Sequence, residues 1–177
     1  GTEYARTKEG NGNSYNLGDV NAFDWKRIDT YATEVAYFKG LGEIRNAFSP
    51  FRSSSTVVNP SYLSTGSNVI AYTLNNSKAG EWSSALVIMN NGGAASVTLP
   101  AGEWTVVADG TKAGLTSLGS ASGTYNVPAN GSAILVKGTT TATSATYEKV
   151  TVKHVADGKE IKTSETLYAV GDTWRAV

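Results

Sequence analysis

A helical pattern of apolar residues stands near the start of the chain. From Ile28 to Phe48 these residues recur at steps of three and four, which places them on one face of a helix. They are Ile28, Tyr31, Val35, Phe38, Leu41, Ile44 and Phe48. Gly40 and Gly42 each weaken this helix by about 1 kcal/mol relative to alanine, which is tolerable where another element presses on the backbone. The segment Ser49–Phe51 ends the helix, because proline disfavours α geometry in the residue before it.

From residue 68 to residue 137 the pattern changes to short apolar or alternating runs separated by turn residues. The runs are NVIAYTLN, SALVIMNN, AASVTLP, EWTVVADG and SAILVKG, and the turns include NNGG, PAGE, ADGT and PANG. Their length and spacing predict a β-meander or Greek key that forms a sandwich. Leu86–Met89 is continuously apolar, which predicts a central strand covered on both sides. Val97 and Leu99 alternate with polar residues and therefore share one face of a strand.

The first 28 residues or so show no sustained periodicity. They carry Tyr4, Tyr15, Phe23 and Trp25 between polar and glycine residues. This pattern is typical of an ordered loop that packs against something else.

A polar tract, TTTATSAT at residues 139–146, lacks hydrophobic anchors and predicts a linker. Beyond it, Val150 and Val152 alternate with polar residues, and ADGK turns the chain back through Glu160 and Ile161 in a predicted hairpin. About thirty residues are too few to fold alone. This piece is therefore expected either to lean on the sandwich or to belong to a natural protein that continues.

The composition narrows the class of protein. Lys plus Arg and Asp plus Glu both number 15 in this chain of 177 residues, so nucleic acid is not an expected partner. The chain has no cysteine, hence no disulfide and no thiolate metal site. No apolar run of about 18 residues and no signal-peptide pattern is present, so membrane insertion is not expected. Nineteen glycines among abundant Ser, Thr, Ala and Asn favour an extracellular all-β protein.

Little in the sequence predicts catalytic or metal chemistry. His154 is the single histidine and is interpreted as a surface strand residue. Glu3, Asp19 and Asp24 could supply paired carboxylates, but their spacing does not show that any two share a cleft. The DVNAFD segment offers oxygen ligands that would suit Ca²⁺ only if the chain folded around the ion. We therefore expect no catalytic residue, no metal site and no cofactor in this chain.

Aromatic residues leave two interpretations open for the β region. Trp82, Trp104, Trp174 and Tyr72 could stack on sugar rings, as in a carbohydrate-binding module. Core or edge packing is the commoner role of tryptophan in small β domains. Trp104 alternates with Val106, which favours burial of Trp104.

The opening stretch GTEYARTKEGNGNSYNLGDVNAFDW and the later LGEIRNAFSPFR carry a family resemblance. They resemble the region after the eighth barrel strand of type I pullulanases, starch-debranching members of the α-amylase superfamily. The matching elements are Gly1 with Glu3, Arg6-Thr7-Lys8, Asn13-Ser14-Tyr15, Asn21 and Asp24-Trp25. The strand region up to residue 138 is similar to the C-terminal sandwich of that family.

The resemblance implies a mainly β fold: an antiparallel Greek-key sandwich, preceded by a loop and the last helix of a (β/α)₈ barrel. It implies that the loop borders the substrate subsites, with Lys8 and Asn11 as candidates for hydrogen bonds to glucosyl hydroxyls. Arg6 and Asn13 are candidates for shaping the loop. The KEGNGNSY loop is richer in glycine than the resemblance leads us to expect.

Catalysis in that family uses carboxylates on barrel strands four, five and seven, which would precede Gly1. We therefore expect a chain that is inactive alone, whose parent hydrolyses α-1,6-glucosidic bonds in pullulan, glycogen and amylopectin dextrins. Calcium in the parent enzyme is left open. The expected partners are the rest of the catalytic barrel and, through the parent enzyme, an α-glucan.

A second resemblance covers KVTVKHVADGKEI and the following ETLYAVGDTW, which are similar to the start of mucin-binding-protein repeats of Gram-positive surface proteins. His154 stands where an aromatic residue is common. The predicted division is a barrel segment at residues 1–50, a sandwich at 51–138 and a linker at 139–146. Residues 147–177 are predicted to be a partial β module, which forms a small β-rich C-terminal extension. The expected location is extracellular, secreted or attached to a bacterial cell surface.

Two other functions and one mode of association stay open at this point. The chain could be a carbohydrate-binding module that uses Trp82 and Trp104, or a cell-surface adhesin that uses residues 147–177. The apolar helix face, if uncovered, also leaves self-association open. The sandwich is expected to cover that face through Ile28, Val35, Phe38 and Ile44.

Overall fold

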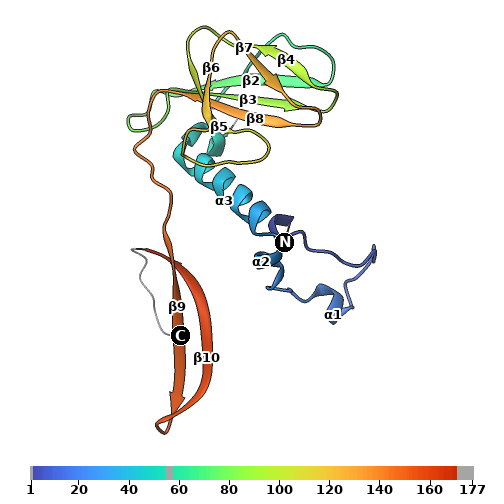
Figure 1. Cartoon of the computed structure of the whole chain (residues 1–177), viewed down its shortest axis with the longest axis vertical. Helices are drawn as coiled ribbons and strands as arrows, with labels where there is room; N and C mark the ends of the chain where they lie inside the picture. The colour runs from blue at the N-terminus through green and yellow to red at the C-terminus, as the bar shows by residue number, and fades with distance from the viewer. Residues whose placement is uncertain (1, 55–57, 171–177) are drawn as a thin grey trace. The chain divides into compact units, whose positions relative to one another are not determined.

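The computed structural model describes residues 2–54 and 58–170 (Figure 1). The described chain divides into two compact units, Gly1–Ala142 and Thr143–Val177. Helical elements come first: η1 Thr2–Tyr4, α1 Gly18–Asn21, α2 Arg27–Thr30, α3 Ala32–Ala47 and η2 Ser49–Arg52. The strands of the first unit are β1 Ser61–Tyr62, β2 Val69–Asn75, β3 Ser84–Asn90, β4 Ala95–Thr98, β5 Trp104–Ala108, β6 Gly119–Ala121, β7 Thr124–Val127 and β8 Ser132–Lys137.

The predicted helix from residue 28 to residue 48 is present but broken into α2 and α3. Tyr31 separates them with φ −112° and ψ 39°, outside the helical region. Apolar spacing alone could not reveal this break, because the three-and-four spacing continues across it. Helix α3 ends before Phe48, as predicted, and Pro50 then lies in the first turn of η2.

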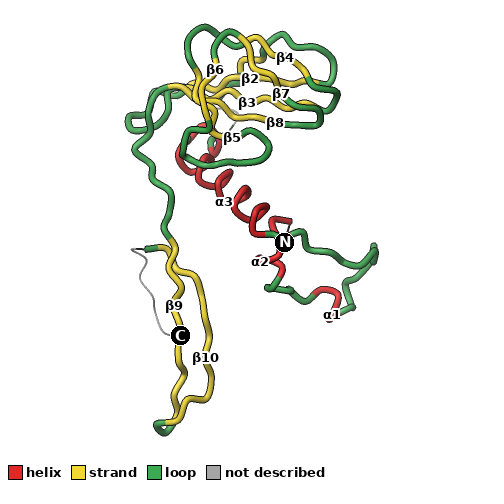
Figure 2. The backbone as a smooth tube through the Cα atoms, viewed as in Figure 1, coloured by secondary structure: helices red, strands yellow, loops and turns green. Residues whose placement is uncertain are grey.

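The predicted mainly β fold is confirmed: strands make up most of the regular structure (Figure 2), and they pair antiparallel. One sheet has the order β1-β2-β3-β8-β5-β6, and a second sheet pairs β4 with β7. Because β8 lies between β3 and β5, the sheet is not a simple meander. The five predicted runs became β2, β3, β4, β5 and β8. Strands β1, β6 and β7 were not predicted: β1 and β6 are only two and three residues long, and the four-residue β7 was missed as well.

The main core lies on the sheet face that receives alternate residues of β2, β3, β8 and β5. Its buried members are Val69, Ala71, Leu86, Ile88, Val97, Leu99, Trp104, Val106, Val127, Ala133 and Leu135. The prediction that Val97 and Leu99 share one face is confirmed, and both are buried in this core. The prediction that both faces of β3 are covered holds for Leu86–Ile88 but is wrong at Met89, which is exposed. Met89 pairs with the exposed Ile70, beyond the part of the sheet that α3 covers.

A second core forms where the C-terminal end of α3 packs on the opposite sheet face. Its buried members are Ile44, Ala47, Phe48, Leu74, Trp82, Ala85, Val107, Ala108 and Val136. A Cβ atom at Gly40 would lie 1.9 Å from the Ala113 carbonyl oxygen, so another element does press on the helix at this glycine. At Gly42 a Cβ atom would meet nothing within 4 Å, so no neighbouring element presses on the helix there.

The expectation that the sandwich covers the helix from Ile28 to Ile44 is wrong for most of that length. Ile44 is buried in the second core, but Ile28 and Val35 are only half-buried and Phe38 is exposed. Only the C-terminal end of α3 lies against the strands, while its beginning lies beside α2 and η1 (Figure 1). A period of 3.6 identifies the apolar face but not how much of its length a neighbour reaches.

The second unit is a hairpin of β9 Tyr147–Ala156 and β10 Lys159–Ala169, as predicted for the turn at ADGK. Asp157 and Gly158 have φ values of 50° and 74°, the left-handed pair that a tight hairpin turn requires. Lys153 forms an ion pair with Glu160 at 3.0 Å, and Lys149 forms another with Glu165.

Candidate functional site

The base of the loop between η1 and α1 is held by three residues. The Arg6 Nη2 atom donates to the Asn21 carbonyl oxygen at 2.6 Å. The Ser14 Oγ atom donates to Asn21 Oδ1 at 3.0 Å, and Asn21 Nδ2 donates back to the Ser14 carbonyl oxygen. Asn21, at the end of α1, therefore holds the chain segments around Arg6 and Ser14 together at the loop base. Charge-assisted bonds such as that of Arg6 are the stronger kind.

Arg27 makes a second set of hydrogen bonds inside the N-terminal segment. Its Nε atom donates to the Tyr4 carbonyl oxygen at 3.3 Å, and its Nη2 atom donates to the Ala5 carbonyl oxygen. The Arg27 guanidinium also lies 4.7 Å from the centre of the Tyr31 ring. Sequence reasoning assigned Arg27 no role, because its partners are backbone atoms more than 20 positions away.

The tip of the loop is a tight turn from Lys8 to Asn11. The Asn11 N–H donates to the Lys8 carbonyl oxygen at 2.9 Å, and Asn11 Nδ2 donates to the same oxygen at 3.2 Å. Glu9 and Gly10 have φ values of 53° and 79°, the pattern of a type I′ turn. The turn fixes the backbone and leaves the Lys8 and Asn11 side chains exposed.

The structure thus separates the four residues predicted to serve a glucan site. Arg6 is half-buried and used at the loop base, whereas Lys8, Asn11 and Asn13 are exposed along the loop. Within residues 2–54 and 58–170, the side chains of Lys8 and Asn13 make no hydrogen bond or ion pair. Their roles towards a glucan stay predictions.

A cluster of three aromatic rings lies next to the loop base. Phe23 and Trp25 stack with ring centres 5.4 Å apart, and each ring centre is 6.3 Å from that of Tyr4. The Arg6 guanidinium lies 4.9 Å from the centre of the Phe23 ring. Tyr4 is buried, but Phe23 and Trp25 are 52% and 66% exposed. An exposed aromatic surface of this kind usually marks an interface.

No metal centre assembles among the residues that the structure describes. Asp24 Oδ1 accepts the Lys26 N–H at 3.1 Å, and Asp19 lies in α1. No group of three or more His, Asp and Glu side chains lies close enough to hold a metal ion within that described part. The His154 side chain is exposed on the hairpin, with Nε2 3.3 Å from Ser164 Oγ. Among the described residues, no helix has the length and apolar character needed to cross a bilayer.

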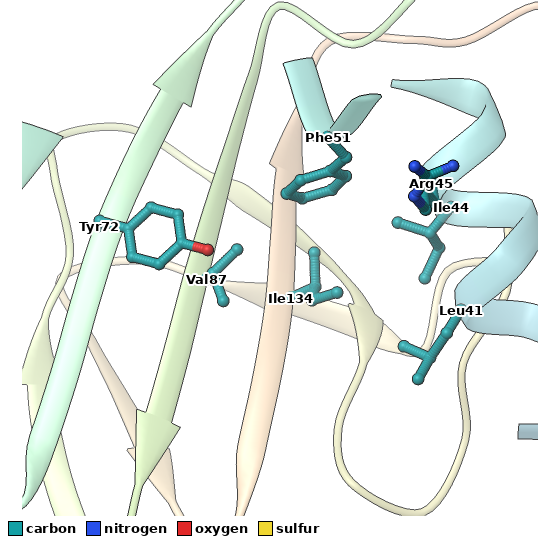
Figure 3. A pocket seen from close by; sticks show the side chains of 7 residues that line it. All are labelled: Leu41, Ile44, Arg45, Phe51, Tyr72, Val87 and Ile134. Carbon is teal, nitrogen blue, oxygen red and sulfur yellow. The ribbon is translucent and has the colours of Figure 1, made fainter. Parts of the chain in front are cut away.

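An apolar cavity of about 270 Å³ lies between α3, η2 and the sheet (Figure 3). Tyr72, Val87 and Ile134 form its floor on the strands, and Phe51 and Leu41 lie on the opposite side. Arg45 contributes the cationic group at its edge. Burial raises the pKa of Tyr72. The lining includes no carboxylate, so the cavity has no acid/base pair for hydrolysis.

The sugar-stacking interpretation fails for two of its tryptophans. Trp82 and Trp104 are only 4% and 2% exposed and belong to the two cores. Trp104 lines a polar cavity of about 390 Å³, but the Lys137 ammonium lies 4.5 Å from its ring centre and covers it. Trp174 lies outside the described residues. Packing therefore accounts for Trp82 and Trp104, as the alternation around Trp104 had suggested.

Glu81 joins the β2–β3 loop to the end of α3. Its Oε1 atom lies 2.7 Å from Lys78 Nζ, and its Oε2 atom accepts the Ser49 N–H at 2.6 Å and Asn76 Nδ2 at 2.9 Å. The Lys78 ammonium and these N–H donors lower the pKa of Glu81 to about 2. The carboxylate therefore stabilises the junction between helix and sandwich.

Comparison with known proteins shows a relationship to pullulanases. Residues 61–112, which run from β1 past β5, match the family described as "Pullulanase, all-beta domain". A pullulanase of Bacillus subtilis (strain 168) is 34% identical over 93 residues, which make up 50% of this chain and 13% of that protein.

Solved pullulanase structures contain a region with the same fold. The pullulanase from Bacillus acidopullulyticus superposes with a TM-score of 0.70 at 36% identity, over 77% of this chain and 18% of that chain. Pullulanase type I from Bacillus subtilis str. 168, complexed with maltose, gives 0.66 at 26% identity, over 77% and 20%. The pullulanase of Anoxybacillus sp. LM18-11, complexed with maltotetraose, gives 0.64 at 24% identity, over 78% and 20%.

The chain therefore contains a β domain related to that of pullulanases by sequence and structure. It spans only between 13% and 20% of the length of these relatives. The relationship to a β domain does not by itself carry the activity of a whole enzyme to this chain.

Proposed function

We propose that this chain is the C-terminal part of a secreted starch-debranching glycoside hydrolase of the pullulanase type. In this proposal residues 1–50 complete a (β/α)₈ catalytic barrel, and residues 51–138 are the sandwich behind it. Residues 147–177 begin an appended module that acts as a spacer or adhesive element at a bacterial cell surface. The whole enzyme hydrolyses α-1,6-glucosidic bonds in pullulan, glycogen and amylopectin dextrins.

The observation that carries the proposal is the contrast inside residues 2–26. Arg6, Ser14 and Asn21 fix the loop base, yet Phe23 and Trp25 leave ring surface open to solvent. A loop held this firmly is prepared to present side chains, and the bare rings suit contact with further protein. The similarity to pullulanases extends over 77% of the chain. It supports the assignment of both the fixed loop and the exposed rings to an enzyme of this type.

The chain contributes positioning and binding groups in this proposal, not the bond-breaking groups. Retaining hydrolysis needs two carboxyl groups about 5 to 5.5 Å apart, and a third supports them in the proposed parent. Those groups would lie on earlier barrel strands. Lys8 supplies an ammonium and Asn11 an amide for hydrogen bonds to glucosyl hydroxyls at the open end of the barrel.

The test uses the whole enzyme from the source gene and pullulan as substrate. Lys8→Ala and Asn11→Ala should each raise KM by about 5- to 30-fold with kcat nearly unchanged, as expected when a hydrogen bond of about 1 to 2 kcal/mol is lost from substrate and transition state alike. Lys26→Ala is the matched control, because Lys26 is an exposed lysine outside the loop, at the start of α2. It should leave both constants unchanged.

Two results would count against the proposal at different levels. Wild-type kinetics for both loop variants would refute the proposed substrate contacts of Lys8 and Asn11. They would leave the proposed enzymatic activity of the whole protein standing. A whole enzyme without activity on pullulan, or an upstream reading frame without a barrel and its three carboxylates, would refute the function. The present chain alone should release no reducing sugar from pullulan.

A further inference from the structure

Asparagine precedes glycine at three places in the chain: Asn11–Gly12, Asn91–Gly92 and Asn130–Gly131. We infer that Asn11 is a site of spontaneous deamidation, and that the fold protects the other two asparagines. The inference concerns the chemistry of this chain and stands apart from the proposed function. It rests on what each following glycine N–H contacts.

Deamidation at such a pair is an intramolecular reaction. The glycine nitrogen loses its proton and attacks the asparagine Cγ atom, so that a new C–N bond closes a five-membered succinimide. The C–N bond of the side-chain amide breaks, and ammonia leaves with the proton. Water then opens the ring at either carbonyl to give aspartate or isoaspartate. The reaction needs a glycine nitrogen that is free of a hydrogen bond and able to approach Cγ.

The glycine nitrogen that follows Asn91 is not free of a hydrogen bond. The Gly92 N–H donates to Asn90 Oδ1 at 3.0 Å. Asn90 is itself held, because its Nδ2 atom donates to the carbonyl oxygens of Gly93 and Pro128 at 2.7 and 2.9 Å. The space around Gly92 is also tight, since a Cβ atom there would lie 3.1 Å from Asn68 Cβ. Attack by Gly92 therefore requires this junction to open first.

Asn130 is protected in a similar way. The Gly131 N–H donates to the Pro128 carbonyl oxygen at 3.2 Å, and the Asn130 N–H donates to the Gly92 carbonyl oxygen at 3.0 Å. A Cβ atom at Gly131 would lie 2.6 Å from Pro128 Cγ, so Gly131 is closely packed against Pro128. The two protected pairs thus lie in loops that bind each other at one end of the sandwich.

Asn11 has neither form of protection. Across the part of the chain that the structure describes, the Gly12 N–H has no hydrogen-bond acceptor. Nothing lies within 4 Å of a Cβ atom built on Gly12, and the Asn11 side chain is exposed. The contact that restrains the Asn11 amide is its 3.2 Å bond to the Lys8 carbonyl oxygen, which is exposed to water. Surface bonds of this kind open readily.

The product changes the chemistry of the loop tip. Either product replaces a neutral amide by a carboxylate next to the Lys8 turn. The isoaspartate product also inserts a methylene group into the backbone between the Asn11 Cα atom and the Gly12 nitrogen, directly after the turn closed by the Asn11 N–H and the Lys8 carbonyl oxygen. The loop would therefore age from a neutral tip to an acidic one.

The test is incubation of the purified chain at mildly alkaline pH, followed by proteolysis and fragment-ion mass spectrometry. Replacement of the amide NH₂ by OH should accumulate at Asn11 at least about tenfold faster than at Asn91 or Asn130, as expected for sites that must first break a hydrogen bond. The same incubation in concentrated urea removes the fold, and the rates at the three Asn–Gly pairs should then converge. Gly12→Ala, which adds a side chain where there is room for it, should slow the reaction at Asn11.

The possible outcomes decide the inference. Faster reaction at Asn11 in the folded chain, together with convergence in urea, supports it. Equal rates in the folded chain, or a faster reaction at Asn91 or Asn130, overturns it. An Asn11 advantage that persists in urea also overturns it, because local sequence and not the fold would then be the cause.

Discussion

Two clusters of aromatic rings in the same unit have similar distances between ring centres and opposite surroundings. Phe48 lies 5.1 Å from Phe51 and 6.5 Å from Trp82, measured between ring centres. Phe23 lies 5.4 Å from Trp25 and 6.3 Å from Tyr4. Phe48 is fully buried, however, whereas Phe23 is half exposed. Ring-to-ring contact therefore does not distinguish a buried core from an exposed surface.

The difference lies in how many elements enclose each cluster. The Phe48 cluster is closed by the end of α3, by η2 and by the strands of the large sheet. The Phe23 cluster lies against the short η1 turn, and hydrogen bonds from Arg6 and Arg27 to backbone carbonyls hold its surroundings. Hydrophobic burial stabilises the Phe48 cluster, whereas hydrogen bonds position the segment around the Phe23 cluster.

The largest expected effect is on the buried cluster. Phe48→Ala should lower the free energy of unfolding by about 3 to 5 kcal/mol, because it removes a fully buried ring and leaves a cavity. Urea denaturation followed by fluorescence measures the change. Phe38→Ala is the matched control: the same substitution at a site 44% exposed should cost less than half as much. Equal costs would contradict the division between core and surface.

The next effect tests the contact between α3 and the sandwich. Gly40→Ala should destabilise the chain by about 1 to 3 kcal/mol, because the new methyl group meets the Ala113 carbonyl oxygen. Gly42→Ala, two positions further on, should stabilise it by roughly 0.5 to 1 kcal/mol, because alanine is the better helix former and has room. Thermal unfolding of both variants compares them directly. The same sign for both would show that the helix does not press on the sandwich at Gly40.

A pH effect should follow from Glu81 at the same junction. Its pKa of about 2 in the folded chain is below the ordinary 4.5, so its contribution to stability is complete above pH 4.5 and is lost as the pH falls towards 2. Glu81→Gln should therefore be less stable than the wild type near neutral pH, and the difference should disappear in acid. Urea denaturation of both proteins across this range measures it. A difference that does not depend on pH would exclude the carboxylate as its cause.

The smallest effect on stability is expected at the exposed cluster. Phe23→Ser should change the free energy of unfolding of the chain by no more than about 0.5 to 1 kcal/mol, since half of the ring already contacts water. The same substitution should reduce the binding of a hydrophobic dye to the chain. In the whole enzyme of the proposed function it should cost clearly more, because the ring would then be covered. Equal small costs in both proteins would remove the argument that this surface is an interface.

The strands that were predicted have runs long enough to show a period, although β7, four alternating residues, was missed. β2, β3, β4, β5 and β8 each carry four or more residues of apolar or alternating character, and all were predicted. β6 consists of Gly-Ser-Ala and carries no such signal. Strands this short form because a neighbour offers its edge, here β5, and not because of their own residues.

The contacts inside the candidate loop could not be predicted from the sequence. The motifs around Arg6, Lys8 and Asn13 pointed to the loop, but nothing in them indicated that Arg6 binds the carbonyl oxygen of Asn21, 15 positions away. A backbone carbonyl is available at every position, so a sequence does not mark which carbonyl a side chain will choose.

The sequence by itself determined the succession of elements: a polar loop, a helix, antiparallel strands and a final hairpin. It could do so because hydrophobic period and turn chemistry act over a few neighbouring residues. Only the tertiary structure decided that α3 meets the sandwich at Ile44 and Phe48 while Phe38 stays exposed, and that Gly92 and Gly131 are locked while Gly12 is free. Those outcomes depend on contacts between residues far apart in the chain, which local patterns cannot specify.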